Sequence, residues 1–193
     1  IAELPKEYVA KDDYRADIQA VPGEGPIRGV SYYNGKVYAW RNNVGSTALK
    51  MFGSSSTGWV EIVAGKQLGF TTGTAEIVEG VTVVGAVSGA TGVVRRTIVR
   101  SSTWLAGTAA GILVLGTTTG TFQAGEGLKV AGVTKATATG AATQISLSPN
   151  GRVQPVVANF GGGQYNLKMY FCDGVNPAFE FDGTNLVPIA TGM

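Results

Sequence analysis

The 193-residue sequence predicts an all-β fold, and three observations lead to that prediction. Glycine occurs 29 times, about twice the usual share of ~7%, which indicates many short segments separated by turns. The glycines follow no Gly-X-Y period and alternate with valine, threonine and aromatic residues, so a collagen-like or disordered chain fits poorly. Short runs of strand-forming residues are bounded by Asn-Gly and Asp-Gly pairs, and this pattern recurs at both ends of the chain.

Residues 1–28 are predicted to form an arm, extended or weakly helical. They contain ten of the charged residues and are interrupted by proline and glycine from Pro22 onward. Such an arm is either a tether to a neighbouring molecule or a frayed terminus. The segment shows no basic region followed by an apolar core, so no signal peptide is expected, and the first residue is not Met, which suggests a processed chain or an excerpt of a longer one.

Residues 29–67 are predicted to form an antiparallel meander. Strands are expected at 30–33 and 36–40, separated by Asn34 and Gly35. Asn-Gly between two such runs predicts a type I′ hairpin turn, in which both central residues need a positive φ. Two further strands are expected at 48–52 and 59–63.

Residues 148–193 repeat this scheme, with expected strands at 167–171, 178–181 and 186–189 and Asp-Gly turns between them. The two ends of the chain therefore look like two copies of one small sheet, as in the blades of a propeller. Two blades cannot close a propeller, which has about 4–8. Further copies of the chain, or sequence beyond it, would have to complete one.

Residues 68–147 are predicted to be an inserted β module, a small sandwich or barrel. This stretch has only eight charged residues and is rich in Gly, Thr, Val and Ala. Its alternating apolar and polar positions place one strand face in a core and the other in solvent. Residues 79–85 and 126–132 match each other, which suggests an internal duplication.

The low charge of the chain beyond the arm favours a surface that is partly covered by partners, although a neutral Ser/Thr-rich surface explains it equally well. The net charge of +2 gives no specific signal for nucleic acid or for an anionic membrane. No apolar run approaches the ~20 residues of a membrane helix, so no membrane insertion is expected.

The sequence predicts no enzyme, because no credible catalytic set is present. Histidine is absent, which removes the commonest general base and metal ligand, and the single cysteine cannot form a usual zinc site. No catalytic residue, cofactor-binding residue or metal ligand is therefore predicted. Cys172 is expected to be a small apolar filler of a strand.

The carboxylates suggest two alternative sites, a catalytic pair and a calcium site. Glu180 and Asp182 alternate along one strand, so they could act as an acid pair in glycan hydrolysis. Asp182, however, fits a turn residue, and Glu180 fits the solvent side of an amphipathic strand. A calcium site built from Asp173, Asn176 and these two residues would lack EF-hand spacing.

One set of residues is predicted to make glycan or interface contacts: Tyr32, Tyr38, Trp40, Arg41 and Trp59. Exposed aromatic rings stack on sugars, but alternating aromatic residues in a meander also form core and cross-strand pairs. A basic cluster of Arg95, Arg96 and Arg100 lacks interleaved aromatics and is expected to be a solvated strand edge.

Several motifs resemble structural proteins of bacteriophage tails: residues 25–30, the hairpin at 34–41, and the segments 172–176 and 179–184. The middle segment, at 89–92, 104–111 and 120–126, resembles a β module found in phage virion proteins. The resemblance covers residues 25–193 and implies a virion component such as a tail nozzle, hub or tube-associated protein. It carries no active-site residue to this chain, which is far shorter than a complete propeller protein of that kind.

The first functional hypothesis is thus a non-enzymatic virion structural protein of the phage tail, whose partners are copies of itself and other tail or neck proteins. The alternative is a receptor- or glycan-binding module at the tail tip, with a host surface receptor as its partner. A third hypothesis is a tail-borne glycan hydrolase.

Overall fold

The structure is a computed structural model that describes residues 19–160 and 167–189. Its fifteen strands pair antiparallel, and the described residues contain no helix, so the predicted all-β class is confirmed. No helix in this part of the chain is long and apolar enough to cross a membrane. The chain divides into two compact units: unit 1 comprises residues 1–63 and 147–177, and unit 2 comprises residues 64–146 and 178–193.

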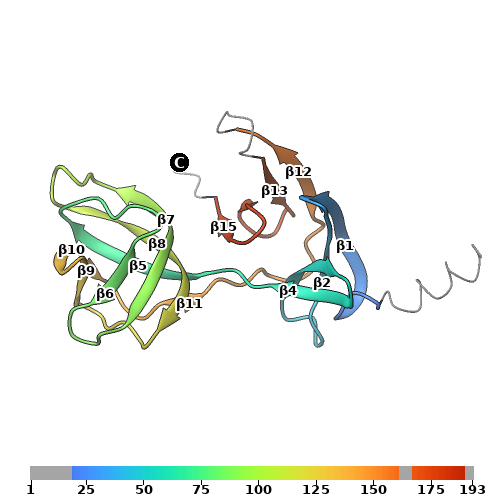
Figure 1. Ribbon diagram of the computed structural model, residues 1–193, viewed down its shortest axis with the longest axis horizontal. Coiled ribbons are helices and arrows are strands. Elements are labelled where there is room, and N and C mark those ends of the chain that lie inside the picture. Colours follow the sequence, from blue (N-terminus) through green and yellow to red (C-terminus); the bar gives the residue numbers. More distant parts are fainter. Residues whose placement is uncertain (1–18, 161–166, 190–193) are drawn as a thin grey trace, which may run out of the picture. The chain divides into compact units, whose positions relative to one another are not determined.

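Unit 1 contains a four-stranded meander in the order β1-β2-β3-β4 (Figure 1). Its strands are β1 (Glu24–Tyr33), β2 (Lys36–Asn42), β3 (Leu49–Ser55) and β4 (Gly58–Ile62). The turn between β1 and β2 has positive φ at Asn34 (48°) and Gly35 (76°), which confirms the predicted type I′ hairpin.

The predicted boundary of the arm is wrong at its end, because β1 begins at Glu24 and residues 24–28 are strand. Glu24 pairs with Asn42, and an irregularity separates this pair from the regular register that starts at Gly29. Gly25 has a φ of 68°, so the backbone bulges there and then rejoins the ladder. Residues 1–18 of the predicted arm lie outside the described residues.

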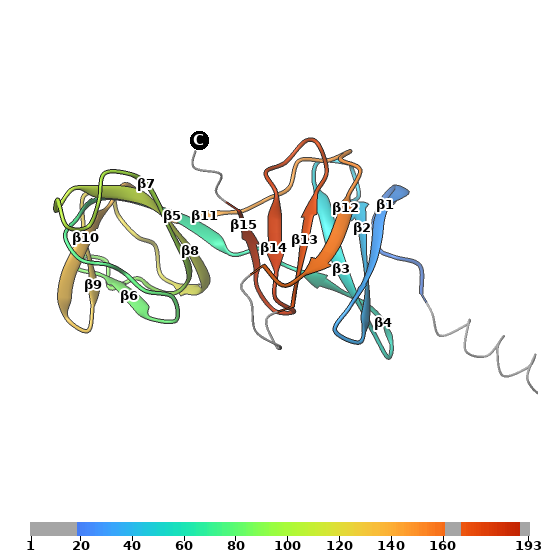
Figure 2. The same cartoon turned by 90° about the horizontal axis from the view of Figure 1, so that it is seen from above.

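The inner face of this meander packs against strands β12 (Gln154–Ala158) and β13 (Lys168–Cys172), which pair with each other (Figure 2). Trp40 is fully buried and meets Phe171 edge-on, with ring centroids 5.0 Å apart. Gly29 lies against Val153, where a side chain on residue 29 would collide.

Strand β12 was not predicted, since its residues lack a clear alternation. Cys172 ends strand β13 but is exposed, so the expectation that it is an apolar filler of a strand is correct as to the strand and wrong as to the filling.

Unit 2 contains a seven-stranded sheet in the order β10-β9-β6-β7-β8-β5-β11. An additional pairing joins β10 to β5, which closes six of the strands into a barrel (Figure 1). Its strands are β5 (Lys66–Gly73), β6 (Thr82–Gly85), β7 (Thr91–Ser101), β8 (Ala109–Thr119), β9 (Gly127–Val130), β10 (Val133–Ala138) and β11 (Thr143–Gln144).

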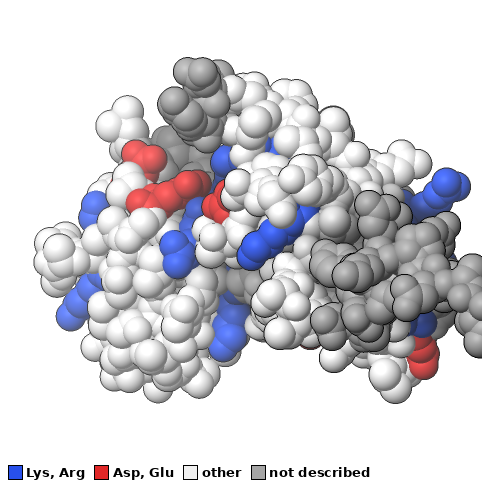
Figure 3. Space-filling view, turned by 45° about the vertical axis from the view of Figure 1, so that its right-hand side comes forward, with Lys and Arg blue, Asp and Glu red and all other residues white. Residues whose placement is uncertain are grey.

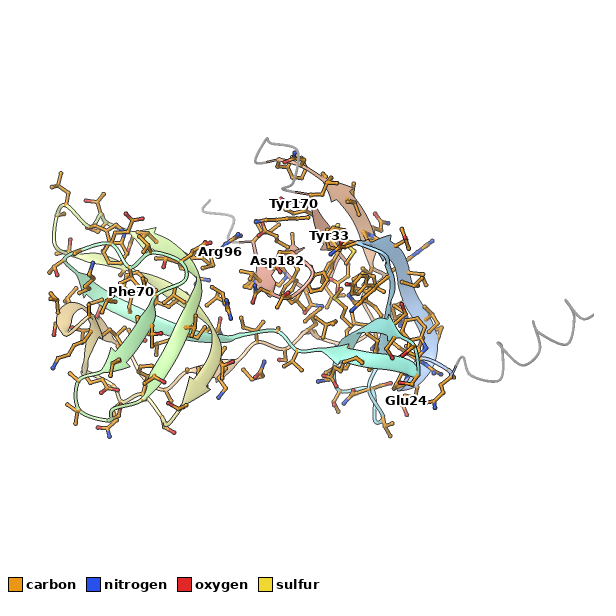
Figure 4. The ribbon with its side chains drawn as sticks, viewed as in Figure 1. Glu24, Tyr33, Phe70, Arg96, Tyr170 and Asp182 are labelled. Carbon is orange, nitrogen blue, oxygen red and sulfur yellow. The ribbon has the colours of Figure 1, made fainter. Side chains whose placement is uncertain are left out.

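Side chains fill the interior of this closed sheet. Phe70, labelled in Figure 4, and Phe122 are buried with four alanines and a set of branched aliphatic residues. Small and large residues together fill a narrow barrel, which is how barrels of this size are normally packed. The interior is therefore a core.

Unit 2 also contains the hairpin of β14 (Phe179–Phe181) and β15 (Leu186–Pro188). Val187 packs with Ile98 and Val114 of the closed sheet. The Arg96 side chain donates to Glu180 at 2.6 Å (Figure 4 labels Arg96). The predicted solvent side of the strand at Glu180 is thus wrong: this carboxylate is buried because it pairs with a cation.

The predicted solvated strand edge at Arg95, Arg96 and Arg100 is correct as to the edge, because β6 pairs only with residues 91–93 of β7 and the three arginines lie where β7 pairs with β8 alone. Arg100 is exposed, while Arg95 and Arg96 are half-buried. The suggested duplication of residues 79–85 and 126–132 stays a prediction. Both segments contain a strand, β6 and β9, and these strands pair with each other, but Glu79 is an exposed partner of Arg96 whereas its counterpart Glu126 is buried.

Two loops in the C-terminal region share one hydrogen-bonding pattern. Asp173 accepts from the backbone N–H of Val175 and Asn176 and from the Asn176 side chain. Asp182 accepts in the same way from Thr184 and Asn185. The expected Asp-Gly turns are thus held by their own aspartates.

A propeller completed by further copies stays a prediction.

Candidate interaction surface

The outer face of the β1–β4 meander carries an exposed apolar patch. Val30, Tyr32 and Val37 are 58%, 69% and 38% exposed, and we call these three residues the outer patch. Tyr32 and Val37 are directly opposite each other in the β1–β2 pairing. Directly paired residues point to the same side of a sheet, so their side chains form one continuous row.

The alternation of the strands explains this arrangement. Tyr33, Tyr38 and Trp40 point to the inner face and are buried, while their chain neighbours point outward. The predicted contact set is therefore divided by the fold. Tyr38 and Trp40, at 2% and 0% exposure, belong to the core and are wrong as surface contacts, whereas Tyr32 is open to solvent.

The other two predicted contact residues, Arg41 and Trp59, hold the segment that precedes β1. The Arg41 guanidinium donates to the carbonyl oxygens of Val21 at 2.6 Å and Gly25 at 2.9 Å. The Trp59 indole N–H donates to the carbonyl oxygen of Gln19 at 2.8 Å. All three bonds reach main-chain carbonyls, so the meander binds this segment largely without regard to its side chains.

Glu24, labelled in Figure 4, fixes the start of β1. Its carboxylate accepts a hydrogen bond of 2.7 Å from the Ser46 hydroxyl in the loop between β2 and β3. That bond, with a second from the backbone of Gly45, holds the pKa of Glu24 below its ordinary value. The start of β1 is thereby fixed beside the loop between β2 and β3, at the end of the hairpin that lies away from the Tyr32–Val37 pair.

Charge is sparse on this protein. On the face drawn in Figure 3, most of the described surface is uncharged, and lysine, arginine and acidic side chains occupy a small part of it. The outer patch itself is formed by two valines and a tyrosine, and a contiguous exposed apolar row of this kind indicates an interaction site more strongly than scattered single residues do. Sequence reasoning identified Tyr32 but missed Val30 and Val37, which the period of two along the predicted hairpin could have revealed.

Both carboxylates of the alternative acid pair have hydrogen-bond or ion-pair partners. Glu180 binds Arg96, and Asp182 is occupied by the N–H groups of its own turn. Neither therefore matches an acid and base held free on either side of a substrate bond. Within the described ranges, no group of three or more His, Cys, Asp or Glu side chains is placed to hold a metal ion.

Glu126 is the most strongly bound carboxylate of unit 2. It accepts hydrogen bonds from the backbone N–H of Val87, Ser88 and Gln123 and from the Ser88 hydroxyl, at 2.6–3.0 Å. Burial raises its pKa, but these bonds outweigh burial and lower the pKa to about 2. The charge joins two loops at one end of the barrel, so its role is structural.

Comparisons with known proteins add no identification: no protein-family model, curated protein or solved structure matches the chain. The surface must therefore be interpreted from its own chemistry.

Proposed function

We propose that this chain is a non-enzymatic structural protein of a bacteriophage virion, a tail component that assembles with copies of itself and with other tail proteins. The observation that carries the proposal is the outer patch: three neighbouring apolar side chains exposed on the outer face of the β1–β2 hairpin. The motif resemblance to phage tail proteins supports the location in the particle.

The chemistry of the patch suits assembly. Association that buries Val30, Tyr32 and Val37 removes apolar surface from water, which stabilises a complex by roughly 25 cal/mol per Å² before the costs of association. The sheet beneath is rigid because its inner face is packed core, so little conformational entropy is lost on binding.

The glycan-binding alternative receives less support. Its proposed stacking platform loses Tyr38 and Trp40 to the core, and the indole N–H of Trp59 is already bonded to Gln19. Tyr32 is the member of the set that offers a widely exposed ring. A glycan array probed with the full chain distinguishes the two functions: specific binding lost in Tyr32→Ala would favour the receptor-binding function.

The proposal is tested by sedimentation velocity of the full chain over a concentration series. We expect reversible self-association that Tyr32→Asp weakens by about thirtyfold, which corresponds to a hot-spot loss of ~2 kcal/mol. Val44→Asp is the control, because Val44 is an apolar residue at least as exposed as Tyr32 but lies in the loop between β2 and β3. A chain that stays monomeric up to roughly 1 mM, where contacts worth about 4 kcal/mol would appear, contradicts self-assembly.

The tail location is tested separately. Antibodies raised against the chain should label the tails of purified phage particles from the source culture in electron micrographs. Labelling of no particle, or of heads alone, would overturn the assignment to the tail.

A further inference from the structure

The sequence contains two Asn-Gly pairs with closely matched neighbours. Residues 34–37 are Asn-Gly-Lys-Val, and residues 150–153 are Asn-Gly-Arg-Val. The asparagine has a positive φ in both pairs, 48° at Asn34 and 73° at Asn150. The sequence therefore gives the two pairs nearly the same intrinsic reactivity, and a difference between them must come from their surroundings in the folded chain.

An asparagine followed by glycine can lose its side-chain amide without an enzyme. The backbone nitrogen of the glycine gives up its proton to solvent and attacks the Cγ atom of the asparagine. A new C–N bond forms, the bond from Cγ to the side-chain nitrogen breaks, and that nitrogen takes up a proton and leaves as ammonia. Water then opens the resulting succinimide to aspartate or isoaspartate. Glycine favours the attack because it has no Cβ atom to obstruct the approach.

Asn34 and Gly35 are open to this reaction. Both are exposed, and they form the central positions of the type I′ turn between β1 and β2. Among the described residues, none forms a hydrogen bond with the Asn34 side chain or with the Gly35 N–H. Chain neighbours apart, no heavy atom lies within 4 Å of the position that a Cβ atom on residue 35 would take. The side chain can therefore rotate toward the Gly35 nitrogen, and solvent reaches both groups.

Asn150 is held in place. Its side-chain oxygen accepts hydrogen bonds from the Arg28 guanidinium at 2.7 Å and from the Asn42 amide at 2.9 Å. Its backbone N–H donates to the Asn42 side-chain oxygen at 3.2 Å. Rotation of the Asn150 side chain toward the next nitrogen in the chain would break the first two of these bonds, which opposes the attack.

Gly151 is shielded as well. It is buried, and a side chain on residue 151 would collide with the Asp173 carboxylate. A negative charge beside the backbone nitrogen of Gly151 opposes the loss of its proton. The two Asn-Gly pairs thus differ at both reacting groups, the side-chain Cγ and the glycine nitrogen.

We infer that Asn34 is a site of spontaneous deamidation in the folded chain, whereas the fold protects Asn150. Either product places a negative charge in the turn that joins the two strands of the outer patch. Isoaspartate also adds a carbon atom to the main chain, which the two-residue turn does not accommodate. The reaction needs only the folded chain and water, so it goes beyond the proposed function and does not depend on it.

The test is incubation of the full chain in mildly alkaline buffer, followed by digestion in acid and mass spectrometry. Conversion of an amide to an acid raises the mass of a peptide, so the rate at each position is measured directly. We expect position 34 to react about tenfold or more faster than position 150, because Asn150 reacts only after local opening. In concentrated urea the two rates should agree within about twofold, because little structure then separates the pairs.

Asn34→Gln supplies a second measurement on the intact chain. Ion-exchange chromatography separates the acidic species that accumulates during incubation, and this species should be nearly absent in Asn34→Gln, whose longer side chain closes a ring far more slowly. Circular dichroism confirms that the variant is folded. Equal rates at positions 34 and 150 in the folded chain overturn the inference. A difference that persists unchanged in urea also overturns it, because the cause would then lie in the sequence.

Discussion

The Arg96 guanidinium lies 2.6 Å from the Glu180 carboxylate, which links strand β7 to strand β14 across 84 residues of sequence. Glu79 offers a second carboxylate to the same guanidinium, 3.5 Å from its Nε. The Glu180 side chain is far less exposed than that of Glu79, so the pair with Glu180 has less water to screen it.

Removing the Glu180 carboxylate should therefore destabilise unit 2. We expect Glu180→Ala to lower the free energy of unfolding by about 2 kcal/mol, because it leaves a half-buried guanidinium without its main partner. Urea unfolding measures the change. Glu79→Ala is the matched control and should cost less than ~1 kcal/mol, as exposed ion pairs do. Equal losses of stability in the two variants would contradict the conclusion that Glu180 is the main partner of Arg96.

Glu126 should make the barrel sensitive to acid. Its folded pKa of about 2 lies below the ordinary value of 4.5, so its stabilising contribution is complete above pH ~4.5 and is lost as the pH falls toward 2. That contribution is about 3 kcal/mol at neutral pH.

Urea unfolding of Glu126→Gln at a series of pH values checks this prediction. The difference in stability between the original chain and the variant should be large at pH 6 and shrink toward pH 3. A difference that does not change with pH would show that the negative charge of Glu126 contributes nothing.

Arg41 should control the order of the segment before β1. Arg41→Met removes both charge-assisted bonds to the Val21 and Gly25 carbonyls, and each such bond contributes about 1.5–3 kcal/mol. Amide hydrogen exchange across residues 19–25 should therefore accelerate about tenfold or more. Lys50→Met is the control, since Lys50 only pairs with exposed Glu61 on the same meander. Unchanged exchange in Arg41→Met would mean that other contacts hold the segment.

Trp104 should stabilise the loop between β7 and β8, residues 102–108. Trp104→Ala removes the stack on Phe70. Replacing a fully buried tryptophan by alanine lowers the free energy of unfolding by about 3–5 kcal/mol. Because Trp104 is only half-buried, we expect a smaller loss. Thermal unfolding measures that loss. Amides of residues 102–108 should also exchange faster, whereas those of the loop at 86–90 should not. Equal acceleration in both loops would point to general loosening of the barrel.

Short-range backbone preferences made the fold class and several turns predictable from the sequence. The glycine content and strand runs predicted the all-β class, and Asn34 and Gly35 predicted a type I′ turn, because only short-range backbone preferences decide these features. The Asp-Gly loops at 173–174 and 182–183 follow for the same reason, since each aspartate binds N–H groups two and three residues ahead.

Only the tertiary structure decided which side chains are buried and which are paired. Glu180 looked like a solvent-facing residue, yet its partner Arg96 comes from a strand 84 positions away, a separation that no local pattern encodes. Tyr32 and Trp40 look alike in sequence, but they fall on opposite faces of one sheet, and packing of β12 and β13 covers only the inner face. Leu105 is exposed because Gly73 and Phe70 of another strand accept the ring of Trp104, and that long-range contact turns the neighbouring side chain into solvent.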